Sequence, residues 1–297
     1  MTQPPNHPTE PEDSLSRLMH GPSGILAAAA LLLGLLSLLM FQSRTQIRTP
    51  PSLLAVNISF CVILMGITAL YRVRRMSRQT LTRLTAAAAL LLGLAGPVIY
   101  SWQTLQFRQA MQNAETANVS AIVSFCHHYA EYAEGNHGSY PPDLATLVSN
   151  GGGGVLIESL VSPYTGQTPD VFGSLPTPAT TAPQSSADIP SALPKVTFTE
   201  FAAKVRVHSD YEYVGADLRT DLFAKVPELK KNAIVVFSKE ARMRAFIAVG
   251  FADGRVELLG PEQTIAALKA NNESRAQAGL PPLSPPQSVT AATAPTP

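Results

Sequence analysis

The residues best suited to metal binding lie together near the middle of the chain. Cys126, His127 and His128 are consecutive, and His137 follows soon after. Thiolate and imidazole groups are common zinc ligands, but neighbouring residues on a helix point about 100° apart, so His127 and His128 do not readily hold one ion. We therefore expect no metal ligands here, with Cys126 facing the core and the histidines solvated beside a turn.

Aspartates offer a second route to a metal site. They are spread over residues 143–221, at Asp143, Asp170, Asp210, Asp217 and Asp221. Calcium loops place oxygen ligands at alternating positions of one short loop, and these aspartates do not follow that spacing. Calcium binding is therefore left only as a minor alternative.

The signatures of common catalytic sites are absent from the sequence. Residues 151–154 are glycines, but the Lys-Ser/Thr pair of a phosphate-binding loop does not follow them. No Gly-x-Ser-x-Gly nucleophile elbow occurs, and Asp253-Gly254 is typical of a tight turn. We therefore expect a protein that is not an enzyme, with no catalytic residues, no cofactor-binding residues and no cofactor.

The composition points toward a membrane. The chain has 297 residues, of which 14% are charged and 45% are hydrophobic, and its formal net charge is +1. So few charges are typical of a membrane protein or of a chain with disordered tails. The near-neutral charge argues against nucleic-acid binding, which needs clustered lysines and arginines. The two cysteines, Cys61 and Cys126, fit small buried apolar residues rather than a disulfide.

Three uncharged apolar segments cover residues 23–41, 52–71 and 84–102. A helix of about 19 residues is roughly 28 Å long, close to the roughly 30 Å hydrocarbon core of a bilayer. We therefore predict a three-helix transmembrane region at residues 23–102, with the lipid bilayer as its partner.

Arginines set the expected orientation. The loop before the third segment carries Arg72, Arg74, Arg75, Arg78 and Arg83, whereas the loop before the second carries only Arg44 and Arg48. Cytoplasmic loops hold the excess of Lys and Arg, so the arginine-rich loop is expected inside the cell. This predicts a multi-pass protein of the inner (cytoplasmic) membrane, with a cytoplasmic N-terminus and an extracytoplasmic C-terminal domain.

The leader at residues 1–22 is polar and rich in proline, and we expect it to be disordered in the cytoplasm. Its acidic residues, Glu10, Glu12 and Asp13, outnumber Arg17. A signal peptide begins with a positively charged region instead. The first apolar segment is therefore expected to remain as a membrane span.

The third apolar segment is expected to continue as a long helix. No proline or glycine occurs from residue 103 to 134, and Ile122, Phe125, Tyr129 and Tyr132 recur on one helical face. Gly135 is suited to end this helix and Gly138 to allow a second reversal. Tyr140 is then expected to fill the corner, followed by a short helix at residues 143–149 with Leu144 and Leu147 facing inward.

The remainder is expected to form an antiparallel sheet. Residues 151–154 are expected to form a loop, and the Pro/Ala/Ser/Thr stretch at 174–194 a disordered insert. Alternating or short apolar runs predict strands near residues 196–201, 211–213, 233–237, 245–251 and 256–259. A polar turn is expected at 239–244, a hairpin turn at Asp253-Gly254, a helix at 262–277 with Ile265 and Leu268 on one side, and a disordered tail at 281–297. The predicted fold class is therefore α+β, with the long third helix packed on the sheet.

Two stretches carry a family resemblance. AEYAEGNHGSYPPDLATLV, residues 130–148, resembles the corner after the long helix in the major pseudopilin of type II secretion. GFADGRVELL, residues 250–259, resembles the end of prepilin-like proteins, in which a histidine precedes the Asp-Gly by ten places and Met243 stands here. The chain departs from pilins before the third apolar segment, where no Gly-Phe cleavage junction and no glutamate occur.

The resemblance implies that residues 103–280 form an extracytoplasmic pseudopilin-like domain with a pilin-like long helix. We therefore expect a non-enzymatic protein that acts by protein-protein contact in secretion or cell-envelope assembly, with protein partners in the envelope and no nucleic acid. Two alternatives are an extracytoplasmic ligand-binding or sensing module and an exported enzyme of unknown reaction. The sequence leaves the oligomeric state open.

Overall fold

The computed structural model describes residues 22–42, 53–74, 80–132, 137–173, 175, 197–239 and 246–285. The chain forms two compact units, Met1–Ala110 and Met111–Pro297, which we call the helical unit and the sheet unit. The leader, nearly all of the expected insert and most of the expected polar turn at 239–244 lie outside the described residues, as does Gly135.

The helical unit contains α2 (Pro22–Gln42), α3 (Leu53–Val73) and the first part of α4 (Thr80–Tyr132). Each of these helices is long and apolar enough to cross a membrane. The predicted spans at 23–41 and 52–71 are confirmed to within two residues at each end. The chain is therefore a multi-pass membrane protein.

Small side chains line the contacts between these helices. A Cβ atom placed on Gly96 would lie 1.9 Å from the Ser59 hydroxyl oxygen, and one on Gly93 would lie 2.8 Å from the Ile63 side chain. The hydroxyls of Ser37 and Ser59 are 2.8 Å apart and hydrogen-bonded. Helix backbones approach this closely only where side chains are small, so the glycines decide where α4 contacts α3.

Helix α4 does not end with its apolar segment but runs unbroken, through Pro97, to Tyr132. In the sheet unit it buries Val119, Ile122, Val123 and Cys126. The predicted continuation of the third apolar helix is confirmed, and so is the expectation that Cys126 faces the core. The aromatic face predicted from Ile122, Phe125, Tyr129 and Tyr132 is correct except at its end, because Tyr132 is 69% exposed.

The sheet has four antiparallel strands in the order β1-β2-β3-β4. They are β1 (Tyr211–Tyr213), β2 (Ile234–Ser238), β3 (Ile247–Phe251) and β4 (Val256–Leu259). The turn between β3 and β4 places Gly254 at φ 91°, and Gly254 N–H donates to the Phe251 carbonyl oxygen. This confirms the hairpin predicted from Asp253-Gly254, and the α+β class as a whole.

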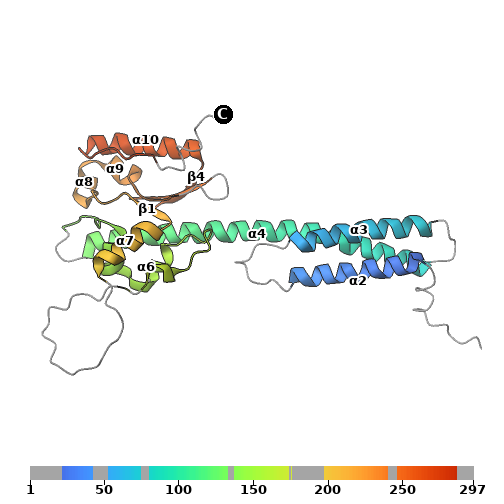
Figure 1. The fold of residues 1–297 in the computed structure, drawn as a ribbon. Helices are drawn as coiled ribbons and strands as arrows, with labels where there is room; N and C mark the ends of the chain where they lie inside the picture. Colours follow the sequence, from blue (N-terminus) through green and yellow to red (C-terminus); the bar gives the residue numbers. More distant parts are fainter. Residues whose placement is uncertain are drawn as a thin grey trace, which may run out of the picture. The chain divides into compact units, whose positions relative to one another are not determined.

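Helices cover both faces of this sheet. Val119 and Val123 of α4 lie against Gly250 of β3, whereas Leu268 of α10 (Pro261–Gln277) packs with Phe237 and Ile247 of the opposite face. Figure 1 shows α10 along its side of the sheet. Of the two residues expected to face inward from α10, only Leu268 does, because Ile265 is 43% exposed.

Polar contacts hold α10 in place. The ladder between β2 and β3 shifts register between Ile234 and Val236, and Ile234 N–H donates to Asn271 Oδ1 at 3.0 Å. Beyond α10, Leu283 N–H donates to Asn272 Oδ1 at 2.8 Å, and the Leu283 carbonyl accepts from Asn272 Nδ2. Residues 281–285, which we expected to begin a disordered tail, are therefore bound to α10 instead.

The glycine run is the first place where the predicted local structure is wrong. Helix α5 (Leu144–Leu147) passes into a π-helical turn, Val148–Gly152, and then into α6 (Gly153–Ser159). The expected loop at residues 151–154 is thus helical. Glycine loses more backbone entropy than other residues in a helix, but the flanking Leu147, Val148 and Leu156 are fully buried, and their burial offsets that cost.

The expected strand near residues 196–201 is also wrong. Thr197 caps α7 (Phe198–His208) in a capping box, in which its hydroxyl accepts from Glu200 N–H while the Glu200 carboxylate accepts from Thr197 N–H. Phe201 and Val205 are buried at the helical spacing of four. Two short helices, α8 (Thr220–Lys225) and α9 (Pro227–Asn232), and the short 3-10 helix Pro169–Phe172 were not predicted.

Candidate functional site

The corner after α4 is built around Tyr140. Its ring is 2% exposed and packs edge-on against Phe223 and His127, and its hydroxyl lies 3.2 Å from His127 Nδ1. Tyr140 N–H donates to the Leu218 carbonyl oxygen at 3.0 Å. Burial raises the pKa of the Tyr140 hydroxyl. This confirms the expected role of Tyr140, which joins the end of α4 to the segment before α8.

Positive backbone angles form the turn that precedes Tyr140. His137 has φ 47° and Gly138 has φ 79°. A side chain at position 138 would place its Cβ 2.1 Å from the Thr220 hydroxyl oxygen. The expected reversal at Gly138 is therefore present, and the close approach of Thr220 excludes any larger residue there.

The potential zinc ligands point into different surroundings. Cys126 is buried and His127 contacts Tyr140, while His128 is exposed and stacks on Tyr132, with ring centroids 4.7 Å apart. His137 is exposed in the turn. Within the described ranges, no three Cys, His, Asp or Glu side chains come close enough to hold a metal ion.

The aspartates considered for calcium have structural contacts. Asp143 caps α5 by accepting from Thr146 N–H at 2.7 Å, Asp217 pairs with the buried Arg275, and Asp221 pairs with Arg219 at 2.9 Å. Asp170 lies in the first turn of the 3-10 helix. Side-chain contacts within the protein thus engage three of the five aspartates, Asp143, Asp217 and Asp221.

The fifth aspartate belongs to a buried polar cluster that the sequence did not reveal. Asp210 Oδ2 accepts from Ser162 N–H at 2.8 Å and from the Thr165 hydroxyl at 2.9 Å, and the Ser162 hydroxyl donates to Glu115 Oε2 at 2.6 Å. Glu115 is only 3% exposed. The cluster ties α4, the Ser-Pro-Tyr-Thr turn and the start of β1 together, because each buried carboxylate needs donors from the other segments. Burial and Glu115 raise the pKa of the nearby Tyr211 hydroxyl.

A half-enclosed trench runs between α5, α7 and β1, with a volume of about 190 Å³. Its apolar walls come from Leu144 and Ala145 of α5 and from Ala202 and Val205 of α7. Strand β1 forms the third side, and charged side chains are present in the lining: Asp143, Arg206, Glu212 and Lys239. The Tyr213 hydroxyl donates to the Pro141 carbonyl oxygen at 2.8 Å, which fixes β1 against the corner. The trench therefore combines apolar walls with charged side chains at its lining.

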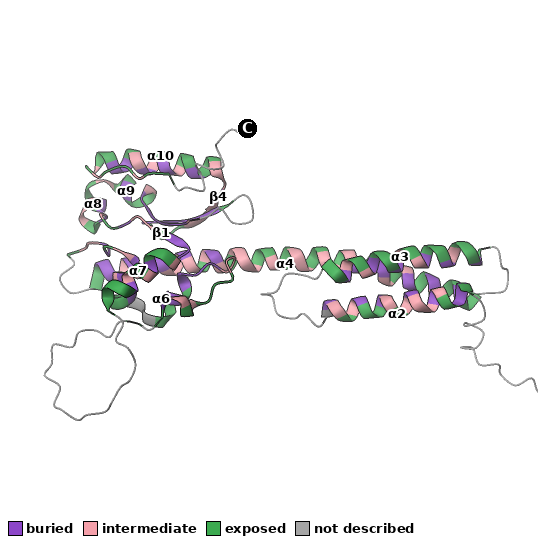
Figure 2. Ribbon diagram, in the orientation of Figure 1, coloured by how far each residue is buried: buried purple, intermediate pink, exposed green. Residues whose placement is uncertain are grey.

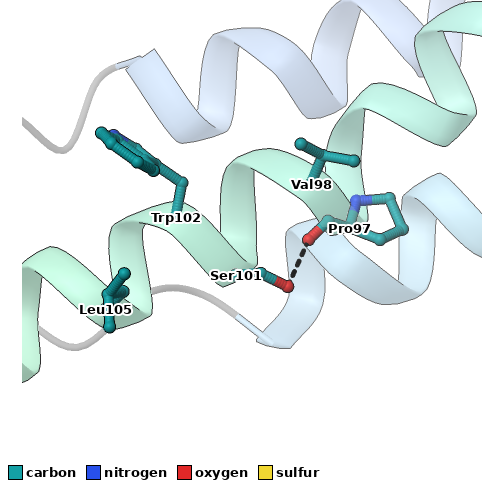
Figure 3. Close-up of a pocket in the computed structure, with 5 residues that line it drawn as sticks. All are labelled: Pro97, Val98, Ser101, Trp102 and Leu105. Atoms are coloured by element: carbon teal, nitrogen blue, oxygen red, sulfur yellow. Dashed lines mark hydrogen bonds between the residues drawn. The ribbon is translucent and has the colours of Figure 1, made fainter.

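The helical unit offers a different surface. A shallow depression follows one face of α4, and Figure 3 shows it lined by Pro97, Val98, Ser101, Trp102 and Leu105. The Ser101 hydroxyl donates to the Pro97 carbonyl oxygen at 2.9 Å. Val98 and Trp102 are 68% and 61% exposed. Such an open apolar surface with a tryptophan suits contact with lipid near the membrane interface.

Sequence reasoning missed both the trench and the Glu115 cluster. One wall of the trench belongs to α7, which was predicted as a strand. The usable signal for α7 was Thr197 three residues before Glu200, a capping-box spacing. No local signal marks Glu115, because its partners lie about 50 to 100 residues away in the chain.

No protein-family model matches the chain, and neither a curated protein nor a solved structure matches it. The function is therefore inferred from the sequence and the geometry described above.

Proposed function

We propose that the chain is a membrane-anchored, non-enzymatic, pseudopilin-like protein that acts by protein-protein contact in secretion or cell-envelope assembly. The observation that carries the proposal is the packing of α4 on the sheet at Val119, Val123 and Gly250, directly followed by the corner at Tyr140. The same order of long helix, Gly-x-Tyr-Pro corner, short helix and antiparallel sheet defines the resemblance to the major pseudopilin. Here the long helix is the continuation of a membrane span.

The arrangement in the membrane follows from charge. The arginines between α3 and α4 favour a cytoplasmic position for that loop, which places the N-terminus inside and the sheet unit outside the inner membrane. The sheet unit then meets its partners in the extracytoplasmic space. Its solvent-exposed apolar side chains, which include Tyr132, Val155 and Val207, are suitable points of contact.

Photocrosslinking in the native cells tests this function. A photoreactive amino acid at Tyr132, whose side chain is 69% exposed, is expected to capture components of a secretion or pilus-assembly machinery. The same probe at Leu91, which is 70% exposed on the apolar part of α4, is the matched control and is expected to capture lipid. Capture of no envelope protein from Tyr132 or other exposed sheet-unit positions would overturn the proposal.

A further inference from the structure

Strand β1 is an end strand of the sheet, so one of its edges is not paired with another strand. Lys239 N–H donates to the Asp210 carbonyl, and Val214 N–H donates to the Val235 carbonyl. In an antiparallel ladder this register turns the backbone groups of Tyr211 and Tyr213 away from β2. The outer edge of β1 therefore presents the backbone groups of these two tyrosines.

The two tyrosines differ in whether their outer backbone groups are already used. Ser209 Oγ accepts from Tyr211 N–H and donates to the Tyr211 carbonyl, each at 3.1 Å. The backbone N–H and carbonyl of Tyr213 form no hydrogen bond with any residue in the described ranges. An unpaired donor and acceptor on an edge strand are a template for an added strand.

The trench beside this edge has the shape and chemistry to receive an extended segment. Leu144, Ala145, Ala202 and Val205 give it small apolar walls, which can accept one side chain of every two in an added strand. Its volume of about 190 Å³ suits a few residues of an extended chain and is small for a folded partner.

Charge indicates what kind of segment fits. Lys239 Nζ donates to the Arg206 carbonyl oxygen at 2.9 Å, and within the described residues neither Lys239 nor the Arg206 guanidinium forms an ion pair. Of the carboxylates that also line the trench, Asp143 already caps α5, and Glu212, like Arg206, is exposed to solvent. Burial lowers the pKa of Lys239, and Glu212 and Asp210 partly oppose that effect. An incoming carboxylate would complement the two cations.

We propose that the trench binds an extended acidic peptide segment of a partner protein, which pairs with the Tyr213 backbone as a fifth strand and places a carboxylate beside Arg206 and Lys239. The inference rests on the proposed contact function and specifies its partner: a short linear stretch that contains Asp or Glu. The apolar walls receive alternate side chains of the segment, and the cations fix its register.

Selection of short linear peptides from a phage-displayed library on the full-length protein in lipid nanodiscs tests the proposal. The selected peptides are expected to be enriched in Asp or Glu. Binding of a selected synthetic peptide, followed by fluorescence anisotropy, is expected to weaken at least tenfold in an R206Q/K239Q variant and with an Asp-to-Asn version of the peptide. K269Q, at an exposed position of α10, is the matched control and is expected to bind the peptide as tightly as the unmodified protein does. Hydrogen exchange is expected to slow at the Tyr213 amide when the peptide binds.

Selection of peptides without acidic residues, equal binding to the R206Q/K239Q variant, or unchanged exchange at Tyr213 would each overturn this assignment. Thermal unfolding of R206Q/K239Q, expected to match that of the unmodified protein, shows that lost binding is not lost folding. If the peptide result fails while envelope proteins are still captured from Tyr132, the contact function stands and only the trench is excluded. If both fail, the contact function is excluded as well.

Discussion

The two units bury opposite kinds of side chain. In the helical unit the fully buried residues include Ala27, Ala30, Ala86 and Ala89, while Leu91 is 70% exposed. In the sheet unit the fully buried residues include many large ones, among them Ile122, Leu147, Phe172 and Phe201. In Figure 2, exposed and intermediate colours cover most of α2 and α3.

The difference follows from the solvent that each unit faces. Lipid is as apolar as leucine, so burying a leucine in a membrane gains little, and helices associate through close packing of small residues. Water makes the burial of each large apolar side chain favourable by about 1.5–3 kcal/mol. Helix α4 shows both patterns. In the helical unit it buries the small residues Ala86, Ala89 and Gly93, and in the sheet unit it buries the larger Val119, Ile122 and Val123.

The largest loss of stability in the sheet unit is expected from adding one carbon atom at Gly250. A Cβ there would lie 2.6 Å from Val123 Cγ2 and 2.8 Å from Val119 Cγ1. We expect Gly250→Ala to destabilise the sheet unit by about 3 kcal/mol, the upper part of the range for an overpacked core. Proteolysis of the sheet unit at increasing urea concentrations, with the protein in detergent, measures the change.

Two further variants sharpen this test. Gly154→Ala is the matched control, because a Cβ there meets no atom within 4 Å, and it is expected to have little effect. Val123→Ala in the Gly250→Ala background removes the clashing methyl group of Val123, though not that of Val119, and is expected to restore part of the stability. Equal stability of Gly250→Ala and the unmodified protein would refute the contact between α4 and the sheet.

In the helical unit the same substitution at adjacent positions is expected to destabilise the packing at one position and to be tolerated at the other. Ala89 is fully buried, whereas Ala88 is exposed. Ala89→Leu is expected to destabilise the helix packing by about 2 kcal/mol through overpacking, and Ala88→Leu is expected to be tolerated because its side chain meets lipid. Steric trapping or thermal unfolding in bicelles would compare the two. Similar loss from both variants would show that α4 faces its neighbours differently.

Some elements of the two units were predicted correctly from the sequence, and others were missed. The apolar spans, the continuous α4 and the hairpin at Asp253-Gly254 were predicted correctly, because their signals lie within a few neighbouring residues. The helix at 198–208 was missed because its local signal, the capping-box spacing of Thr197 and Glu200, was not used. The helical glycine run was missed because burial of Leu147 and Leu156 overrides the low helix propensity of glycine. The Glu115 cluster and the trench could not be predicted from the sequence, because their residues are far apart in the chain and come together only in the folded protein.

The α10 face of the sheet is expected to be less sensitive than the α4 face, because hydrogen bonds contribute to holding it. Asn271 accepts from Ile234 N–H at 3.0 Å and is fully buried. Asn271→Ala leaves that N–H unsatisfied, at a cost of about 1–2 kcal/mol. Asn113→Ala on an exposed face of α4 is the matched control. Urea unfolding followed by tyrosine fluorescence measures both, and equal effects would argue against the Asn271 contact.

The smallest expected effect is a pH dependence. Burial raises the pKa of the Tyr140, Tyr211 and Tyr213 hydroxyls above the ordinary value of 10. The unfolded chain then loses these protons from about pH 10 upward while the folded chain keeps them, so stability is intact below pH 10 and falls as the pH rises above it. Ultraviolet titration is expected to show at least three tyrosines that ionise only on unfolding.

Two variants show which tyrosines resist ionisation in the folded protein. Tyr140→Phe is expected to lower by one the number of tyrosines that resist ionisation, whereas Tyr132→Phe, at an exposed position, is expected to lower the number that titrate normally. Ionisation of all tyrosines near pH 10 in the folded protein would contradict the burial of the corner.

The contact between α4 and the sheet is tested most directly by a disulfide between positions 123 and 250. Cysteines are introduced as V123C and G250C in a chain that lacks Cys61 and Cys126, and oxidation in membranes is followed by mass spectrometry. A cysteine at position 123 also removes a methyl group of Val123, which relieves one of the two contacts shorter than 3 Å that a Cβ at position 250 would make. We expect a disulfide in V123C/G250C and none in S124C/G250C, because Ser124 lies on the exposed side of the helix. No disulfide from position 123, or equal yields from positions 123 and 124, would contradict it.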